Sequence, residues 1–448
     1  MLSPDEAKDR CVALLRRAEA AGAEAGDTVY LANASQSVTV RLGALEDVER
    51  SESEHIGLRV FAGGGSASIG STDLGDAALD ELAQRAVAMA RLAPPDRFAG
   101  LADAGLLLRD MPPALDLDDG GEAEPMALRR MAEAVEAAAL AVPGVTNSNG
   151  GSASSGRSVF ALATSHGFTG AYAASSHGIS ASVVAGEGST MQRDYAYTSA
   201  RHASDLRDLA AIGEEAATRA TRRVNPGRMR SGAMPVVFDP RVGSSLVGHL
   251  IGAINGASIA RRASFLLDRD GAQLFDSAIT ILDDPHVRRG LRSRPFDGEG
   301  LPTAARALVE QGRLTGWLMD SAAARQLSLA PSGHAGRGGS GAPHVSTGNV
   351  TLSPGTLSPA QLIADIAEGV YVTELIGSGV NGVTGDYSRG ASGYRITGGV
   401  IGEPIAEFTV AGNLIDMFAA LVAANDLEVI HGIDVPTLRI DGMTVAGD

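Results

Sequence analysis

The sequence predicts an α+β fold: N-terminal antiparallel sheets with helices on one face, then a β-rich, sheet- or barrel-like C-terminal domain with a few packed helices. Three observations support this class. Helical segments flank groups of strand-like segments and do not alternate with them one by one. Most strand-like segments alternate apolar and polar residues and end at glycine-containing turns. Glycine supplies 56 of the 448 residues and aromatics only 4%, which favours strands with small side chains and many turns.

The first helix is predicted from its start signal. Ser3 is a helix-capping serine, Pro4 suits the first turn, and Glu6 completes a capping box. Cys11 lies on the apolar stripe of this helix, so we interpret it as a small buried residue and not as a nucleophile. Strand-like segments follow at 28–34, 37–42, 56–61 and 66–71, and a second helix ends before Pro94-Pro95.

Three domains are predicted: 1–110, 111–227 and 228–448. An acidic, proline-containing connection at 111–125 leads to a helix and then to a strand meander over 158–198. His166-Gly167 and His177-Gly178 are interpreted as turns of that meander. A helix over about 204–222 closes this half, and Asn225-Pro226-Gly227 marks the boundary to the third domain.

The second half is rich in predicted strands, at 234–238, 278–282, 316–319, 348–352, 369–375, 393–396 and 405–410. Ser358 to Gln361 form a second capping box that starts a short helix. A further helix with Leu414, Met417 and Phe418 on one side is expected to pack against a sheet.

Composition excludes several classes of function. The formal charge of −16 opposes nucleic-acid binding, and the one basic cluster is interpreted as complementing a helix C-terminus (Arg219, Arg222, Arg223, Arg228 and Arg230). No apolar run reaches the ~20 residues that span a bilayer, and the N-terminus is charged, so we expect no membrane contact and a cytoplasmic location. A single cysteine excludes a cysteine-rich zinc cluster and fits a reducing compartment.

The helix that begins at Asp239-Pro240 carries one histidine, His249. A catalytic zinc helix needs two histidines about a turn apart and a glutamate beside the first, so that metal and base meet one water. Leu250 follows His249, and Ala253 and Ile254 occupy the positions four and five further on. We therefore predict no zinc on this helix and interpret His249 as a packed, hydrogen-bonded side chain.

Other chemical motifs are weak. The glycine-rich stretch 336–341 lacks the Gly-Lys-Ser/Thr ending of a phosphate loop, and we predict a flexible loop that lines a groove or is disordered. His334 and His344, which flank it, have no metal-helix spacing. The run from Asp283 to His286 resembles ordinary turn chemistry. No Gly-x-Ser-x-Gly elbow is present.

The run 385–390 is richer in polar groups. Asp386, Tyr387, Ser388 and Arg389 are expected on one exposed turn between strands, where they suit peptide-backbone contact or a subunit interface. A capped surface turn without function explains the pattern equally well.

Several separated motifs, in the same order, resemble the TldD/TldE family of peptidases, also called PmbA or "modulator of gyrase" proteins, and specifically the TldE (PmbA) branch. The resemblance is strongest at 262–268, 295–300, 372–375, 383–390 and 411–418. It implies a heterodimer that cleaves peptides, in which the TldD subunit holds zinc through a His-Glu-x-x-x-His helix and a C-terminal cysteine. The helix around His249 has neither the glutamate nor the second histidine, and residues 426–448 contain no cysteine.

The resemblance implies a non-catalytic TldE/PmbA-type subunit that binds no metal itself, with zinc in a TldD-like catalytic partner. We expect an extended peptide as substrate, and leave open a homodimer when the partner is absent. The residues assigned to peptide binding or the interface are Asp386, Tyr387, Ser388, Arg389, Asn381 and Arg262. Two alternatives stay open: a self-sufficient metallopeptidase with non-standard ligands, and a regulatory protein-binding factor of the gyrase-modulator type.

Overall fold

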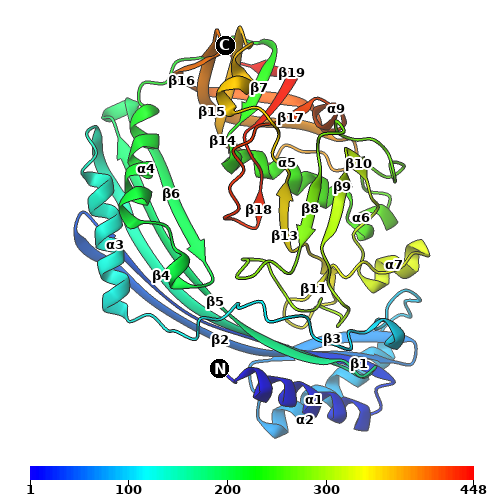
Figure 1. Cartoon of the computed structure of the whole chain (residues 1–448). Coiled ribbons are helices and arrows are strands. Elements are labelled where there is room, and N and C mark those ends of the chain that lie inside the picture. The colour runs from blue at the N-terminus through cyan, green and yellow to red at the C-terminus, as the bar shows by residue number, and fades with distance from the viewer. Residues whose placement is uncertain (448) are drawn as a thin grey trace.

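One long, curved antiparallel sheet forms the N-terminal half. The structure is a computed structural model that describes residues 1–447. The sheet has the strand order β3-β2-β1-β4-β5-β6. Its strands are β1 (Ala25–Arg41), β2 (Ala44–Ala62), β3 (Gly65–Ser71), β4 (Val145–Thr164), β5 (Thr169–Ala185) and β6 (Gln192–Ala200). Figure 1 shows the sheet bending around the C-terminal half, with β6 as its inner edge strand.

Four helices cover the convex face of this sheet, two near each end (Figure 1). They are α1 (Pro4–Ala20), α2 (Asp76–Leu92), α3 (Pro125–Leu140) and α4 (Leu209–Arg222). On β1, Tyr30 packs with the α1–α2 core and Val38 with the α3–α4 core, so even-numbered side chains face the helices throughout. The capping box of Ser3 and Glu6 is present as predicted.

The regions predicted as two N-terminal domains share this one sheet. β1 pairs with β4 from Asp27↔Thr164 to Val40↔Gly151, so residues before and after 111 lie side by side. The strands run longer than predicted because small polar residues continue them. The turn predicted at His177 is wrong: it lies inside β5, 4% exposed, with Nε2 2.8 Å from Asp119 Oδ2. His166 does lie at the β4–β5 turn.

A closed barrel forms the far end of the C-terminal half. The sheet order is β16-β15-β14-β7-β19-β17, and an additional β16–β19 pairing closes the ring. The strands are β7 (Gly232–Phe238), β14 (Glu368–Ile376), β15 (Asp386–Thr397), β16 (Val400–Asn413), β17 (Leu421–Ala423) and β19 (Leu438–Ala446). Only β7 and β14 pair in parallel within this sheet. The barrel-like C-terminal domain of the predicted fold class is thereby confirmed.

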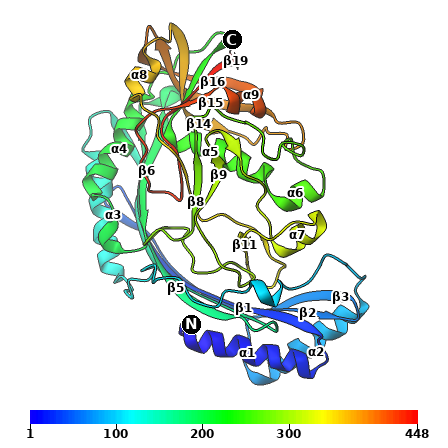
Figure 2. The same ribbon diagram turned by 45° about the vertical axis from the view of Figure 1, so that its right-hand side comes forward.

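A smaller sheet, β10-β9-β8-β13-β18, lies between the barrel and the N-terminal sheet (Figure 2). Its strands are β8 (Ile281–Asp284), β9 (Arg306–Glu310), β10 (Arg313–Leu314), β13 (Asn349–Leu352) and β18 (Ile433–Asp434), beside the short pair β11 (Ala335–Gly336) and β12 (His344–Val345). The helices of this half are α5 (Pro240–Ala253), α6 (Gly256–Ala260), α7 (Ser321–Leu327), α8 (Pro359–Ile363) and α9 (Leu414–Ala419). One apolar core joins α5, the barrel and this sheet.

Buried charges connect the two halves. Arg337, in the glycine-rich stretch, has a fully buried side chain that pairs with Asp27 on β1, and Asp27 also pairs with Arg59 on β2. The prediction of a flexible or disordered loop is therefore wrong. The Arg337–Asp27 ion pair fixes the stretch against the N-terminal sheet, and the Ser340 backbone packs against Gly57, where a larger residue would clash. Within residues 1–447, no helix has both the length and the hydropathy needed to cross a membrane.

Candidate functional site

Helix α5 carries His249 at the predicted place. Asp239 caps the start of the helix, where its Oδ1 accepts a hydrogen bond from Arg241 N at 3.0 Å, and the helix buries Leu246 and Leu250 in the core. His249 is half-buried. Burial, and secondly the charge of Arg389, lower the pKa of its imidazole, so the ring is neutral at pH 7. Its Nε2 is buried without a hydrogen-bond partner among the described residues, unlike the hydrogen-bonded side chain that we predicted.

Tyr387 and Arg389 on β15 face His249. The ring centroids of Tyr387 and His249 are 6.0 Å apart in an edge-on arrangement. Burial raises the pKa of Tyr387 to about 12, although Arg389 opposes this. The Tyr387 hydroxyl and Arg389 Nε are also buried without a geometrically sound partner within residues 1–447. A guanidinium, an imidazole and a phenol hydroxyl therefore lie together, and each has a polar atom without a hydrogen-bond partner among the described residues.

The prediction of an exposed turn at 386–389 is wrong. These residues begin β15, where side chains alternate between two faces, and Tyr387 is 1% exposed in the apolar core. Asp386 and Ser388 point the other way and are exposed. Asp386 Oδ2 accepts from Thr384 Oγ1 at 2.6 Å. The assignment of the four residues to peptide or partner contact stays a prediction.

Asn381 and Arg262 lie on two loops that meet beside this strand. Asn381 Oδ1 accepts from Val383 N and Thr384 N, which shapes the loop before β15. Phe265 N donates to Gly382 O at 2.9 Å and ties the segment after α6 to the same loop. Arg262 itself is exposed and has a left-handed φ of 55°. The residues predicted from the sequence thus lie in one region. Of these, Tyr387 and Arg389 face His249.

The residues around His249 do not fit a catalytic zinc. Such a site needs three protein ligands, whereas the side chains that face His249 include a tyrosine and a guanidinium, and a guanidinium repels a cation. No three His, Cys, Asp or Glu side chains gather into a metal-binding group in the part of the chain that the structure describes. The other histidines named from sequence are used elsewhere: His334 Nε2 lies 3.1 Å from buried Asp283, and His286 Nε2 lies 2.9 Å from Thr303 Oγ1. His344 is exposed.

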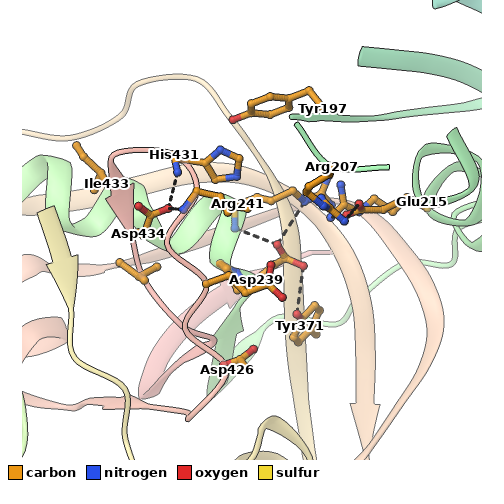
Figure 3. A pocket seen from close by; sticks show the side chains of 15 residues that line it. Tyr197, Arg207, Glu215, Asp239, Arg241, Tyr371, Asp426, His431, Ile433 and Asp434 are labelled. Atoms are coloured by element: carbon orange, nitrogen blue, oxygen red, sulfur yellow. Dashed lines mark hydrogen bonds and ion pairs between the residues drawn. The ribbon is translucent and has the colours of Figure 1, made fainter. Parts of the chain in front are cut away.

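A second candidate region lies between the two halves. A cavity of about 350 Å³ is bounded by Tyr197 of β6, Glu215 of α4, the start of α5 and the segment 426–435 (Figure 3). Arg241 lies between two carboxylates, with Nη1 3.0 Å from Asp194 and Nε 3.3 Å from Asp239. Because these partners are buried, their electrostatic interactions are stronger than in water and favour one arrangement of the side chains.

Sequence reasoning missed this region. It interpreted Arg219, Arg222 and Arg223 as complementing the end of a helix, and the first two do lie in the last turn of α4. Arg223 also bonds Asp194 at 3.2 Å and pairs with Glu374 of the barrel strand β14. The cluster of arginines before a domain boundary was the available signal, but their acidic partners are distant in sequence.

Comparisons with known proteins identify the family. Three family models match the chain: PmbA/TldA metallopeptidase domain 1 at residues 26–90, the central domain at 115–224 and the C-terminal domain at 231–447. Metalloprotease PmbA of Escherichia coli O157:H7 is 39% identical over 92% of this chain and 90% of its own length. A PmbA homolog of Haemophilus influenzae is 34% identical over 92% and 90%.

Solved structures agree with this assignment. A candidate modulator of DNA gyrase from Bacteroides thetaiotaomicron superposes with a TM-score of 0.92 at 26% identity, covering all of both chains. TldE from Thermococcus kodakarensis shares the fold, with a TM-score of 0.84 at 21% identity over 97% of this chain and 99% of its own. The order of the matched domains, the barrel and the relatives lead to one conclusion: this chain belongs to the PmbA/TldD family of metallopeptidase-like proteins.

Proposed function

We propose that this chain is the non-catalytic, TldE/PmbA-type subunit of a two-subunit zinc peptidase that degrades or processes unfolded peptides. The observation that carries the proposal is the ligand-poor helix α5, where His249 stands alone and faces Arg389 and Tyr387. A chain with this helix needs a TldD-like partner to supply the zinc-bound water that attacks the amide.

Cys11, the single cysteine of the sequence, is not suited to act as an alternative nucleophile. Cys11 is fully buried, and burial raises the pKa of its thiol to about 12, so the reactive thiolate is scarce at neutral pH. What His249, Tyr387 and Arg389 can do is hold a carbonyl or carboxylate oxygen, because each has an unused polar atom. Their proposed contribution is therefore to bind and orient peptide or partner backbone. A reducing, cytoplasmic setting suits the single buried thiol.

Reconstitution tests the proposal. The purified chain, a TldD-like chain and their mixture are each incubated with an unstructured peptide and zinc. We expect cleavage by the mixture and none by this chain alone. Turnover by the lone chain that disappears in His249→Ala would favour a self-sufficient metallopeptidase with non-standard ligands.

Arg389 provides the residue-level test. Arg389→Ala should leave the isolated chain folded, with little change in melting temperature, and weaken assembly or peptide cleavage by the complex. Arg389→Lys should not restore function, because an ammonium group cannot copy the planar guanidinium fork. Arg230→Ala, which removes an exposed arginine outside the assigned residues, is the matched control. An unfolded Arg389→Ala chain, or a fully active complex, would make this residue structural.

A regulatory binding role is the second candidate, because the Bacteroides relative is described as a candidate modulator of DNA gyrase. The net charge of −16 opposes contact with DNA but permits a protein partner. Affinity purification from the native host distinguishes the two functions. Recovery of a topoisomerase without any TldD-like chain would favour regulation over peptide cleavage.

A further inference from the structure

A smaller cavity of about 190 Å³ adjoins the pocket of Figure 3 and shares Arg219, Asp239, Arg241 and Tyr371 with it. Its walls come from β6, from α4, from the start of α5 and from the barrel strands β14, β15 and β16. The residues that distinguish it from the larger pocket are Asp194, Thr218, Arg222, Thr373, Tyr394 and Ile401. Three arginines thus line one small space in a strongly acidic protein.

The two carboxylates of this cavity are already neutralised. Asp194 accepts from Arg223 at 3.2 Å and from Arg241 at 3.0 Å. Asp239 accepts from Arg241 at 3.3 Å and from the Tyr371 hydroxyl at 3.2 Å. Arg219 pairs with Glu215 of the same helix, so Arg222 is left as the arginine of the wall without a carboxylate partner among the described residues.

Donors are left over on the walls. Arg222 forms no ion pair within residues 1–447, and its guanidinium carbon lies 5.0 Å from the centroid of the Tyr394 ring. Thr373 Oγ1 is buried and has no hydrogen-bond partner among the described residues. Burial, and secondly the nearby Arg241, lower the pKa of Arg219, although its guanidinium pairs with Glu215. Unused donors and crowded cations are the conditions that an anionic group relieves.

The edge strand β6 contributes Asp194 to the wall of this cavity. This strand is the last in the N-terminal sheet, and successive hollows follow it past 193–195, 197 and 198–201. The carbonyls of Arg193 and Tyr195 accept from Arg223 and Arg219, so the odd-numbered residues point their backbone groups outward. Tyr197 and Ser199 continue that outward series. An unpaired edge of this kind accepts an added peptide strand.

We propose that the cavity lined by Arg219, Arg222 and Arg241 binds the C-terminal carboxylate of an extended peptide, whose chain pairs with β6 beyond Tyr195. The carboxylate lies at the end where β6 begins, so the peptide runs antiparallel to β6. Exposed Tyr195 and Tyr197, whose rings stack with centroids 6.2 Å apart, offer apolar contact to peptide side chains of many kinds. This inference rests on the proposed function, since it selects peptides with a free C-terminus as its substrate class.

Binding of a labelled, unstructured peptide tests the proposal. Fluorescence anisotropy compares the free-acid peptide with the same peptide amidated at its C-terminus, using the full chain alone and in complex with a TldD-like subunit. We expect the free acid to bind about tenfold more tightly or better, because a charge-assisted pair with arginine is lost in the amide. Arg222→Gln should abolish this preference. Arg230→Gln removes an exposed arginine of the same domain boundary that lines none of these cavities, and should retain it.

Three results would overturn the proposal: equal binding of acid and amide, a preference that survives in Arg222→Gln, or no peptide binding by either the lone chain or the complex. Competition by inorganic phosphate distinguishes a peptide carboxylate from a free inorganic anion as the ligand of the cavity. Phosphate that binds tightly without displacing the peptide would assign the cavity to a free anion and also refute it. The acid-to-amide binding ratio is independent of cleavage, so a complex that cleaves peptide but binds the acid and the amide equally refutes this inference and not the proposed function.

Discussion

Glu299 gives the sharpest stability prediction, because it is a carboxyl group in an almost dry environment. It is 5% exposed, between β8 and β9, and its Oε2 accepts from both Ser321 N and Ser321 Oγ at 2.8 Å. Burial, and secondly the charge of Asp297, raise the pKa of Glu299 from 4.5 to about 7. The bonds from Ser321 favour the ionised form but do not offset the loss of water.

The magnitude follows from the difference between the folded and unfolded pKa values. Taking 4.5 for the unfolded chain, the difference is about 2.5, which corresponds to about 3 kcal/mol in the free energy of unfolding. The folded pKa is the higher one, so the folded state holds its proton more tightly. This contribution is fully present below about pH 4.5 and is lost as the pH rises through about 7. Glu299 should therefore destabilise the protein at pH 8 relative to pH 5.

Glu299→Gln tests this reasoning, because an amide oxygen still accepts from Ser321 but carries no titrating proton. Thermal unfolding is followed from pH 5 to 8 for both proteins. The melting temperature of the variant minus that of the wild type should rise with pH, and the variant should gain up to about 3 kcal/mol at pH 8. A difference that is constant with pH, or that falls as pH rises, would refute the assignment. The Asp297 carboxyl is coupled to Glu299, so the pH dependence of this difference belongs to the pair of carboxyl groups.

Three further predictions concern other buried groups. Cys11 should resist alkylation at pH 8 in the native protein and react within minutes after unfolding, and rapid native labelling would contradict its burial and raised pKa. Protein purified without chelator should contain far less than one zinc per chain by elemental analysis, with no change in His249→Ala, whereas near-stoichiometric zinc would contradict the ligand argument. Arg337→Ala should destabilise the fold by about 3 kcal/mol or more, with no rescue by lysine, because it leaves buried Asp27 with Arg59 alone. An unchanged melting temperature would contradict that.

Local signals allowed much of the fold to be predicted. The capping boxes at Ser3 and Ser358 lie at the starts of α1 and α8, because both partners of each box are three residues apart. Helices with one apolar face were also recognisable, since their periodicity is contained in a single stretch of chain. The fold class followed from the order of such segments.

Long-range pairing was not predictable from the same signals. β1 and β4 join residues more than a hundred positions apart, and their middle sections are small and polar, so neither strand reveals its partner. The same limit explains the turn wrongly assigned at His177, whose neighbour Asp119 comes from the acidic connection before α3. A histidine followed by glycine indicates a turn only when no distant carboxylate binds the imidazole.

The candidate site shows the same division between local and distant information. The absence of a zinc motif around His249 is local, so it was visible in the sequence. The side chains that face His249 could not be identified from the neighbouring sequence, because Arg389 lies on a strand 140 residues further on. A guanidinium beside a neutral imidazole and a buried tyrosine hydroxyl disfavours a cation and favours oxygen-bearing ligands. Under the proposed function, the helix that is expected to hold zinc in the catalytic subunit would in this chain bind the peptide or the partner.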